Sequence, residues 1–306
     1  MAAPIIERQL LEKLERLTIR WQKSFRGLVG GHNASRYAGP GQEFLDHRHF
    51  HQGDDLRSVN WRAYMRLEKL FLKMFQVEPR TPIRLLLDAS ESMVAGHTGS
   101  EMSKFDYARK LTAALVYVGL VRHDSLSIQP FHEHLSDPIT ASGGRHRFGP
   151  AADYLSALKA GGRTSFFELA RQFISEYPKP GLLIIVSDFL DDGDPIRPIQ
   201  YLADFGHEIM LLHVWTESER FPQLSGDVAL TDAETGQRLE ISLNDEACAA
   251  YTKAFDDYAA SLEQLARRNG GRYAGLSTSF ALEDAIFKAL MSPAAQAERA
   301  GAGRPA

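Results

Sequence analysis

Short runs of apolar residues recur along this chain, separated by longer stretches in which apolar residues repeat every three or four positions. The runs have the length and composition of strands that are buried on both faces of a sheet. We expect strands at 83–87, 125–131, 182–188, 208–214 and 273–276. We expect helices at 103–121, 150–160, 165–177, 244–269 and 281–291. This alternation predicts the α/β class, with a doubly wound, mostly parallel sheet and helices on both faces.

The first eighty residues follow a different pattern. Residues 5–21 place apolar side chains at helical spacing, which predicts an amphipathic helix that must dock on another surface. Strands are expected near 42–50 and 70–77. Between them, Gly53-Asp54-Asp55 is expected to start a helix, because an aspartate is a favourable N-cap.

A hairpin is predicted at 227–243, turning at Glu234-Thr235-Gly236. This hairpin is a candidate to pair with the N-terminal strands in one small β-rich subdomain. The predicted organisation is therefore an N-terminal helix and β-rich subdomain in 1–80, the main α/β domain in 81–291 and a disordered tail in 292–306.

Composition and charge narrow the function classes. The chain has 306 residues and one cysteine, Cys248, which precludes an internal disulfide and suits a reducing compartment. The N-terminus lacks the apolar core of a signal peptide, and the longest apolar stretch, 111–121, is too short to span a bilayer, so we expect a cytoplasmic protein. Residues 1–80 hold fourteen Lys and Arg against nine Asp and Glu, but a solvated face explains this excess better than nucleic-acid binding does.

Side chains with oxygen atoms follow the strand at 83–87. Asp88, Ser90 and Ser92 form the pattern Asp-x-Ser-x-Ser, which places a carboxylate and two hydroxyls on one tight loop at the carboxyl end of a strand. Hard oxygen ligands of this kind suit Mg²⁺ or Mn²⁺ rather than zinc or copper. The alternative is that these side chains cap the next helix, and the three residues alone do not separate the two hypotheses.

Two later stretches favour the metal hypothesis. Asp188 ends the strand expected at 182–188 and supplies a second carboxylate. Thr164 and Ser165 follow a pair of glycines, and Ser165 opens a Ser-x-x-Glu capping box, which leaves Thr164 as the third hydroxyl. The predicted metal ligands are Asp88, Ser90, Ser92, Thr164 and Asp188.

Other chemistry is less well supported. His47, His49 and His51 alternate and would share one face of a strand, but no Cys or Glu-x-x-His partner lies nearby, so solvent exposure is a better interpretation than a zinc site. The sequence contains no Gly-x-Ser-x-Gly elbow, no Gly-x-x-x-x-Gly-Lys loop and no Gly-x-Gly-x-x-Gly fingerprint.

A series of motifs carries a family resemblance. Gly-x-Glu-Phe at 41–44, then Arg48, then Gly-Asp-Asp-x-Arg-x-x-x-Trp at 53–61 precede the Asp-x-Ser-x-Ser loop. In this order they resemble the domain-of-unknown-function family 58, over roughly residues 10–290. The order Asp, Ser, Ser, Thr, Asp also resembles the metal-ion-dependent adhesion site of von Willebrand factor A domains. One departure is Asn60, where relatives usually carry Asp, so that a charge is lost.

The resemblance implies a von Willebrand factor A-like fold and a Mg²⁺ or Mn²⁺ site. It implies that Ser90, Ser92 and Thr164 contact the ion, that Asp88 and Asp188 act directly or through water, and that an acidic residue of a partner completes the shell. The implied partner is a MoxR-type AAA+ ATPase, with this protein as a non-catalytic adaptor or chaperone-like module. The alternative is a Mg²⁺-dependent phosphohydrolase, but the haloacid-dehalogenase type needs an Asp where this chain has Ser90.

Overall fold

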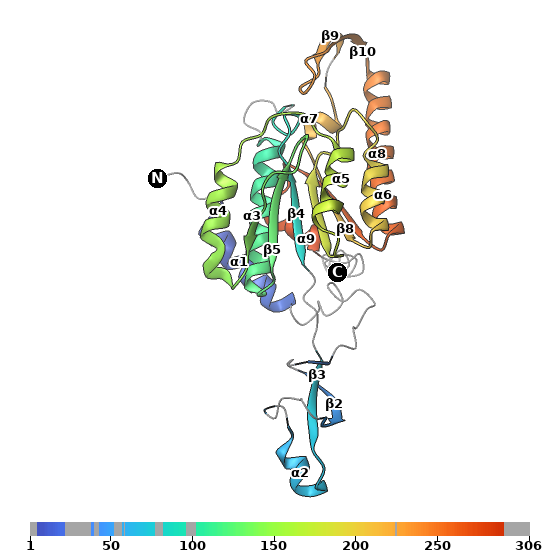
Figure 1. Cartoon of the computed structure of the whole chain (residues 1–306). Helices are drawn as coiled ribbons and strands as arrows, with labels where there is room; N and C mark the ends of the chain where they lie inside the picture. Colours follow the sequence, from blue (N-terminus) through green and yellow to red (C-terminus); the bar gives the residue numbers. More distant parts are fainter. Residues whose placement is uncertain are drawn as a thin grey trace, which may run out of the picture. The chain divides into compact units, whose positions relative to one another are not determined.

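The structure is a computed structural model of the chain, in which two compact units are recognised (Figure 1). The larger unit comprises Met1–Trp21 and Pro82–Ala306, and the smaller unit comprises Gln22–Thr81. The structure describes residues 5–21, 38–39, 43–51, 57, 59–76, 82–95, 102–223 and 225–290.

A six-stranded sheet forms the centre of the larger unit, with the strand order β11-β8-β7-β4-β5-β6. Its strands are β4 (Ile83–Asp88), β5 (Leu126–Phe131), β6 (Ile139–Ala141), β7 (Leu182–Ser187), β8 (Glu208–Trp215) and β11 (Arg272–Ser277). All neighbouring pairs are parallel except β5 and β6, which are antiparallel. The predicted α/β class and doubly wound, mostly parallel sheet are confirmed, while the short edge strand β6 was not predicted.

The apolar run of β4 is buried along its whole length because both faces of the sheet are covered. Leu85 and Leu87 contribute to the hydrophobic core on one face, whereas Leu86 contributes to the core on the other face. This alternation follows from the two-residue repeat of a strand. The central position of β4 fixes the location of the residues that follow it.

Helices cover the two faces of the sheet (Figure 1). On one face lie α1 (Arg8–Trp21), α3 (Lys104–Val121), α4 (Phe148–Ala157) and α9 (Leu282–Leu290). On the other face lie α5 (Phe166–Glu176), α6 (Ile196–Asp204) and α8 (Asp245–Arg268). A short helix, α7 (Glu217–Arg220), follows β8. The predicted helices are present, and Ser165 caps α5 as predicted, because its Oγ accepts a hydrogen bond from the Glu168 backbone N–H at 3.4 Å.

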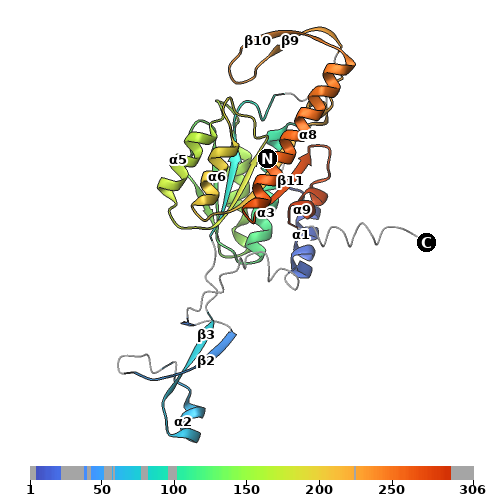
Figure 2. The same ribbon diagram turned by 90° about the vertical axis from the view of Figure 1, so that its right-hand side faces the viewer.

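Two segments differ from the predicted domain organisation. Helix α1 belongs to the larger unit, where Leu14 is fully buried in the core with α3, so the amphipathic stripe docks on the α/β domain rather than on the β-rich segment. The hairpin of β9 (Gly226–Thr231) and β10 (Arg238–Leu243) forms a separate two-stranded sheet in the larger unit. Figure 2 shows this hairpin extending past α8 and over the end of the sheet at which β4 finishes.

The smaller unit contains a three-stranded sheet of order β1-β3-β2 and one short helix. Its elements are β1 (Ala38–Gly39), β2 (Glu43–His49), α2 (Trp61–Leu67) and β3 (Phe71–Gln76). The predicted start of the helix was wrong. Val59 forms an antiparallel bridge with Leu72, and Asn60 is the N-cap, its Oδ1 accepting from the Ala63 backbone N–H at 3.3 Å. An amide oxygen therefore caps the helix here without the charge of an aspartate.

Several predictions fall on parts of the chain that are not described. Gly53-Asp54-Asp55 and the tail at 292–306 lie outside the described residues. His47 and His49 lie on β2, and His49 and His51 are exposed. Within the described part of the chain, no group of three or more His, Cys, Asp or Glu side chains is arranged to hold a metal, and no helix is long and apolar enough to cross a membrane.

Replacement of Gly271 by alanine should destabilise the larger unit. A Cβ at this position would lie 2.1 Å from the backbone oxygen of Ile209, which cannot rotate away, and overpacking of this kind costs roughly 1–3 kcal/mol of unfolding free energy. Gly149 is the matched control, because a Cβ there has no atom within 4 Å. Urea unfolding should show a loss of stability for Gly271→Ala and none for Gly149→Ala, and equal stabilities would contradict the packing described for β8 and β11.

Candidate functional site

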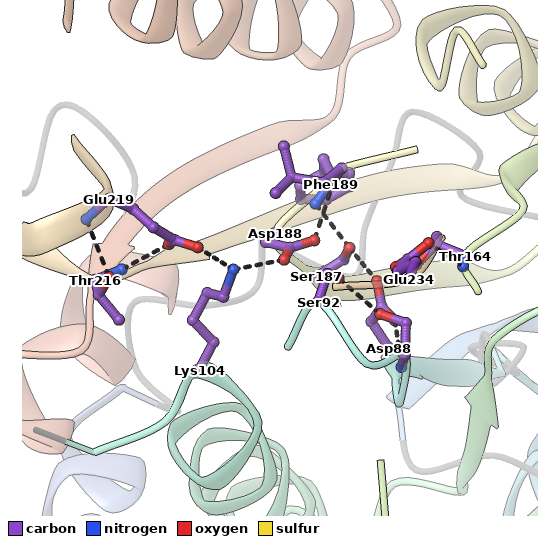
Figure 3. Close-up of polar contacts among 12 residues, drawn as sticks. Asp88, Ser92, Lys104, Thr164, Ser187, Asp188, Phe189, Thr216, Glu219 and Glu234 are labelled. Atoms are coloured by element: carbon purple, nitrogen blue, oxygen red, sulfur yellow. Dashed lines mark hydrogen bonds and ion pairs between the residues drawn. The ribbon is translucent and has the colours of Figure 1, made fainter. Parts of the chain in front are cut away.

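The loop after β4 brings together the first three predicted site residues, of which Figure 3 labels Asp88 and Ser92. Asp88 is fully buried, and its Oδ1 accepts a hydrogen bond from the Ser90 backbone N–H at 3.0 Å. The hydroxyl oxygens of Ser90 and Ser92 lie 2.9 Å apart, and both side chains are buried. The alternate spacing of the motif thus places a carboxylate and two hydroxyls on one turn, as predicted.

The adjacent strand β7 supplies a second group of polar atoms. Ser187, the last residue of β7, donates from its hydroxyl to Asp88 Oδ2 at 2.5 Å and accepts from the Phe189 backbone N–H at 2.8 Å. Asp188 is also buried, and its Oδ1 accepts from the Leu190 backbone N–H at 3.1 Å. Sequence reasoning missed Ser187. Its signal was a hydroxyl that directly precedes Asp188 near the end of a predicted apolar strand.

Thr164 is held next to this loop by backbone hydrogen bonds. The Gly161 N–H donates to Ala89 O at 2.8 Å, and the Glu91 N–H donates to Gly162 O at 3.0 Å. These bonds join the turn before α5 to the turn after β4, and the buried Thr164 follows directly. Its hydroxyl and its backbone N–H both donate to a carboxylate that the sequence did not predict, that of Glu234.

Lys104 is the second unpredicted component. It lies at the first position of α3, is 1% exposed, and donates from Nζ to Asp188 Oδ2 at 2.7 Å and to Glu219 Oε1. Glu219 is held in place by a capping box with Thr216 at the start of α7. Both oxygens of Asp188 therefore have protein partners. A lysine in the first turn of a helix is electrostatically unfavourable unless an acidic group compensates it, and that was the available signal.

Burial and charge act on Asp88 in the same direction. Burial is the larger cause and the nearby negative charge of Asp188 is the smaller one. Together they raise the pKa of the Asp88 carboxyl to about 7, although hydrogen bonds from Ser187 and Ser90 oppose the shift. Nearby, His213 is buried, and desolvation lowers its pKa to about 3, so it stays neutral and adds no positive charge. The part of the site around Asp88 consequently has an excess of negative charge when its carboxyl ionises.

The donor set fits a hard divalent cation rather than a soft one. Its oxygens come from two aspartates, two serines and a threonine. None of these five residues carries a sulfur or imidazole ligand. The residues that could hold such an ion are Asp88, Ser90, Ser92, Thr164 and, through its charge or a water molecule, Asp188. An ion held largely by hydroxyls keeps positive charge, which can attract a further carboxylate.

Replacement of Asp88 by asparagine should remove a pH dependence of stability in the presence of EDTA. Because the folded-state pKa, about 7, exceeds the ordinary value of 3.8, the native protein holds a proton that the unfolded chain releases. The stability that this proton gives the folded protein is fully present below pH ~4 and is lost as the pH rises to about 7. The unfolding free energy of Asp88→Asn minus that of wild type should therefore increase by roughly 2–3 kcal/mol between pH 5 and pH 8.

Urea unfolding at several pH values measures this difference. Asp153→Asn, which changes an exposed aspartate on α4, is the control and should follow the wild-type pH profile. Parallel profiles for wild type and Asp88→Asn would show that the buried carboxyl is not protonated in the native protein.

Comparison with known proteins gives relatives over most of the chain. Rv1480 of Mycobacterium tuberculosis and Mb1516 of Mycobacterium bovis, both described as uncharacterized proteins, are each 23% identical over 274 residues, which cover 88% of this chain and 85% of the relative. Among solved structures, BatB of Bacteroides thetaiotaomicron has a TM-score of 0.41 at 17% identity, covering 67% of this chain and 95% of that one. The von Willebrand factor A domain of SpRpn10 has a TM-score of 0.39 at 12% identity, covering 70% and 96%.

A family model provides the assignment. The model described as "Protein of unknown function DUF58" matches residues 46–263, a span that includes α2 and β3 of the smaller unit and all of the candidate site. Because this span is well over half of the chain, the protein belongs to the DUF58 family.

Proposed function

We propose that this protein is a metal-ion-dependent protein-interaction module and that its site binds Mg²⁺ or Mn²⁺. The observation that carries the proposal is the meeting of Asp88, Ser90 and Ser92 at the end of β4, beside Asp188 and Thr164. When bound, the cation supplies a positive centre that a carboxylate of another protein can approach. The side chains of this site hold and orient the cation.

Electrostatics supports a cation at this position. Burial and the charge of Asp188 keep the Asp88 pKa high, so ionising Asp88 without a counter-charge is costly. Lys104 compensates Asp188 on the side that faces away from Asp88. A divalent ion next to Asp88 would compensate the other carboxylate. We therefore assign Asp88, Ser90, Ser92 and Thr164 as the inner ligands and Asp188 as an outer one.

The geometry argues for binding rather than phosphoryl transfer. The side chain of Asp88 is fully buried, which is unfavourable for a nucleophile that must reach a phosphorus atom. Ser90, two residues on, is hydrogen-bonded to Ser92 and has no acid–base group to offer. Lys104, the nearby cation, is already paired with two carboxylates. A phosphohydrolase is therefore the less favoured alternative.

The proposed partner is a MoxR-type AAA+ ATPase that presents an acidic side chain to the cation. This proposal rests on the family resemblance and on the chemistry of the site, which accepts a carboxylate. In it the protein acts as an adaptor or chaperone-like subunit, and its loops provide specificity while the ion provides the electrostatic attraction.

Mg²⁺ or Mn²⁺ should raise the melting temperature of the wild-type protein. A ligand that binds the folded state at one hundred times its Kd adds about 2.7 kcal/mol of stability, which corresponds to a shift of roughly 5–10 °C for a domain of this size. Asp88→Ala should abolish the shift and Ser92→Ala should reduce it, because each removes an oxygen ligand. Asp153→Asn should retain it.

Thermal unfolding in Mg²⁺, Mn²⁺ and EDTA measures these shifts, and calorimetry measures the affinity. Circular dichroism establishes that each variant is folded before the ion is added. An unchanged metal affinity in folded Asp88→Ala would contradict the assignment of the site.

Association with the cognate ATPase should require the divalent ion. Binding measured in Mg²⁺ should be lost in EDTA and weakened at least tenfold by Ser92→Ala, since one lost ligand interaction of about 1.4 kcal/mol corresponds to that factor. Exchanging single Asp or Glu residues on the ATPase for Asn or Gln should identify the acidic residue. Equal affinity under all conditions would mean that the partner docks elsewhere, for example on the basic N-terminal region.

A further inference from the structure

The tip of the β9–β10 hairpin delivers a carboxylate to the candidate site. Glu234 Oε2 accepts from the Thr164 backbone N–H at 3.0 Å, and Oε1 accepts from the Thr164 hydroxyl at 3.1 Å (Figure 3). Arg163 Nε donates to the Glu234 backbone oxygen at 3.3 Å. A residue seventy positions along the chain thus makes three hydrogen bonds with the loop that carries the proposed ligand Thr164.

The turn is built to present this side chain. Asp232 Oδ1 accepts from the Glu234 backbone N–H at 3.1 Å and from both the backbone N–H and the hydroxyl of Thr235 at 2.6 Å. Gly236 adopts a φ of 70°, which closes the turn at low cost for glycine. The conformation of residues 232–236 is therefore fixed within the turn itself, and Glu234 lies at its end.

The rest of the hairpin contributes little apolar packing. No residue of β9 or β10 is buried, and both strands expose most of their side chains. Leu230 and Leu239, a cross-strand pair, are 41% and 60% exposed. The polar contacts of Glu234 and Arg163 therefore hold the tip against the body in place of a hydrophobic core, and contacts of this kind open more readily than buried apolar ones.

We infer that Glu234 is an internal occupant of the position that a partner's carboxylate takes, so that the β9–β10 hairpin is an autoinhibitory latch. This inference rests on the proposed function, because it assigns to Glu234 the same chemical group that the partner presents. The proposed ligand Thr164 uses both of its donors on Glu234, so an incoming acidic side chain must displace the tip. The apparent affinity for a partner is then reduced by the fraction of molecules in which the tip is docked.

Glu234→Gln tests the latch directly, because glutamine keeps the size of the side chain and removes its charge. Glu240→Gln, an exposed position on β10 of the same hairpin, is the matched control. Amide hydrogen exchange in Mg²⁺ should be at least tenfold faster at Thr164 and at residues 232–236 in Glu234→Gln than in wild type. The control should match wild type, and unchanged exchange in Glu234→Gln would overturn the inference.

A peptide separates this inference from the identity of the partner. The probe is a cyclised peptide with the sequence of residues 231–238, Thr-Asp-Ala-Glu-Thr-Gly-Gln-Arg. In Mg²⁺ it should bind Glu234→Gln at least tenfold more tightly than wild type, whose own tip competes. A peptide with Gln in place of its Glu should bind neither protein. Absence of binding to Glu234→Gln, or equal binding to both proteins, would overturn the latch.

The cognate ATPase is measured with the same variants. Glu234→Gln should bind it at least tenfold more tightly than wild type or Glu240→Gln. Equal binding would overturn the latch and leave the proposed function standing. Selective binding of the peptide with no binding of the ATPase would support the latch and refute the ATPase as the partner.

Discussion

Two carboxylates buried at the ends of neighbouring parallel strands impose the constraint on which this site depends. The strand register fixes their positions: Asp88 ends β4, and Asp188 follows β7, which pairs with β4. A charge that is removed from water needs a compensating partner, so each of these buried side chains requires its own compensation. Asp188 obtains it from the buried Lys104. Asp88 accepts hydrogen bonds from Ser90 and Ser187, and no cationic side chain in the described part of the chain is hydrogen-bonded to it. This asymmetry explains why the proposed cation belongs with Asp88.

The sequence predicted those parts of the molecule that local pattern determines. Apolar runs identified the buried strands because both faces of the sheet are covered, and the spacing of Asp88, Ser90 and Ser92 places their side chains on one turn regardless of distant residues. The start of α2 was predicted wrongly for a related reason. Val59 fits the apolar face of a helix, but it pairs with Leu72 across the smaller sheet, so a tertiary contact outweighed local propensity.

The unpredicted site residues all act over long sequence separations. Lys104 reaches Asp188 across 84 positions and Glu219 across 115, and Glu234 reaches Thr164 across 70. Lys104 and Glu219 lie in no motif, and Glu234 was predicted only as part of a hairpin turn. Each resembles a solvated surface charge when only its neighbours in sequence are considered. Their partners depend on which loops the sheet order brings together, and that order follows from the packing of the whole domain rather than from any single segment.

The proposed cation ligands and the proposed latch lie on different structural elements. The groups around Asp88 and Asp188 belong to the buried ends of β4 and β7, where substitution disturbs the core. Thr164 is also buried, but its donors point toward the hairpin, whose strands are exposed and whose tip is held by polar contacts. Changes in the hairpin should therefore have small consequences for folding. Under the proposed function, the sheet would hold the cation, and residues 226–243 would determine which carboxylate reaches it.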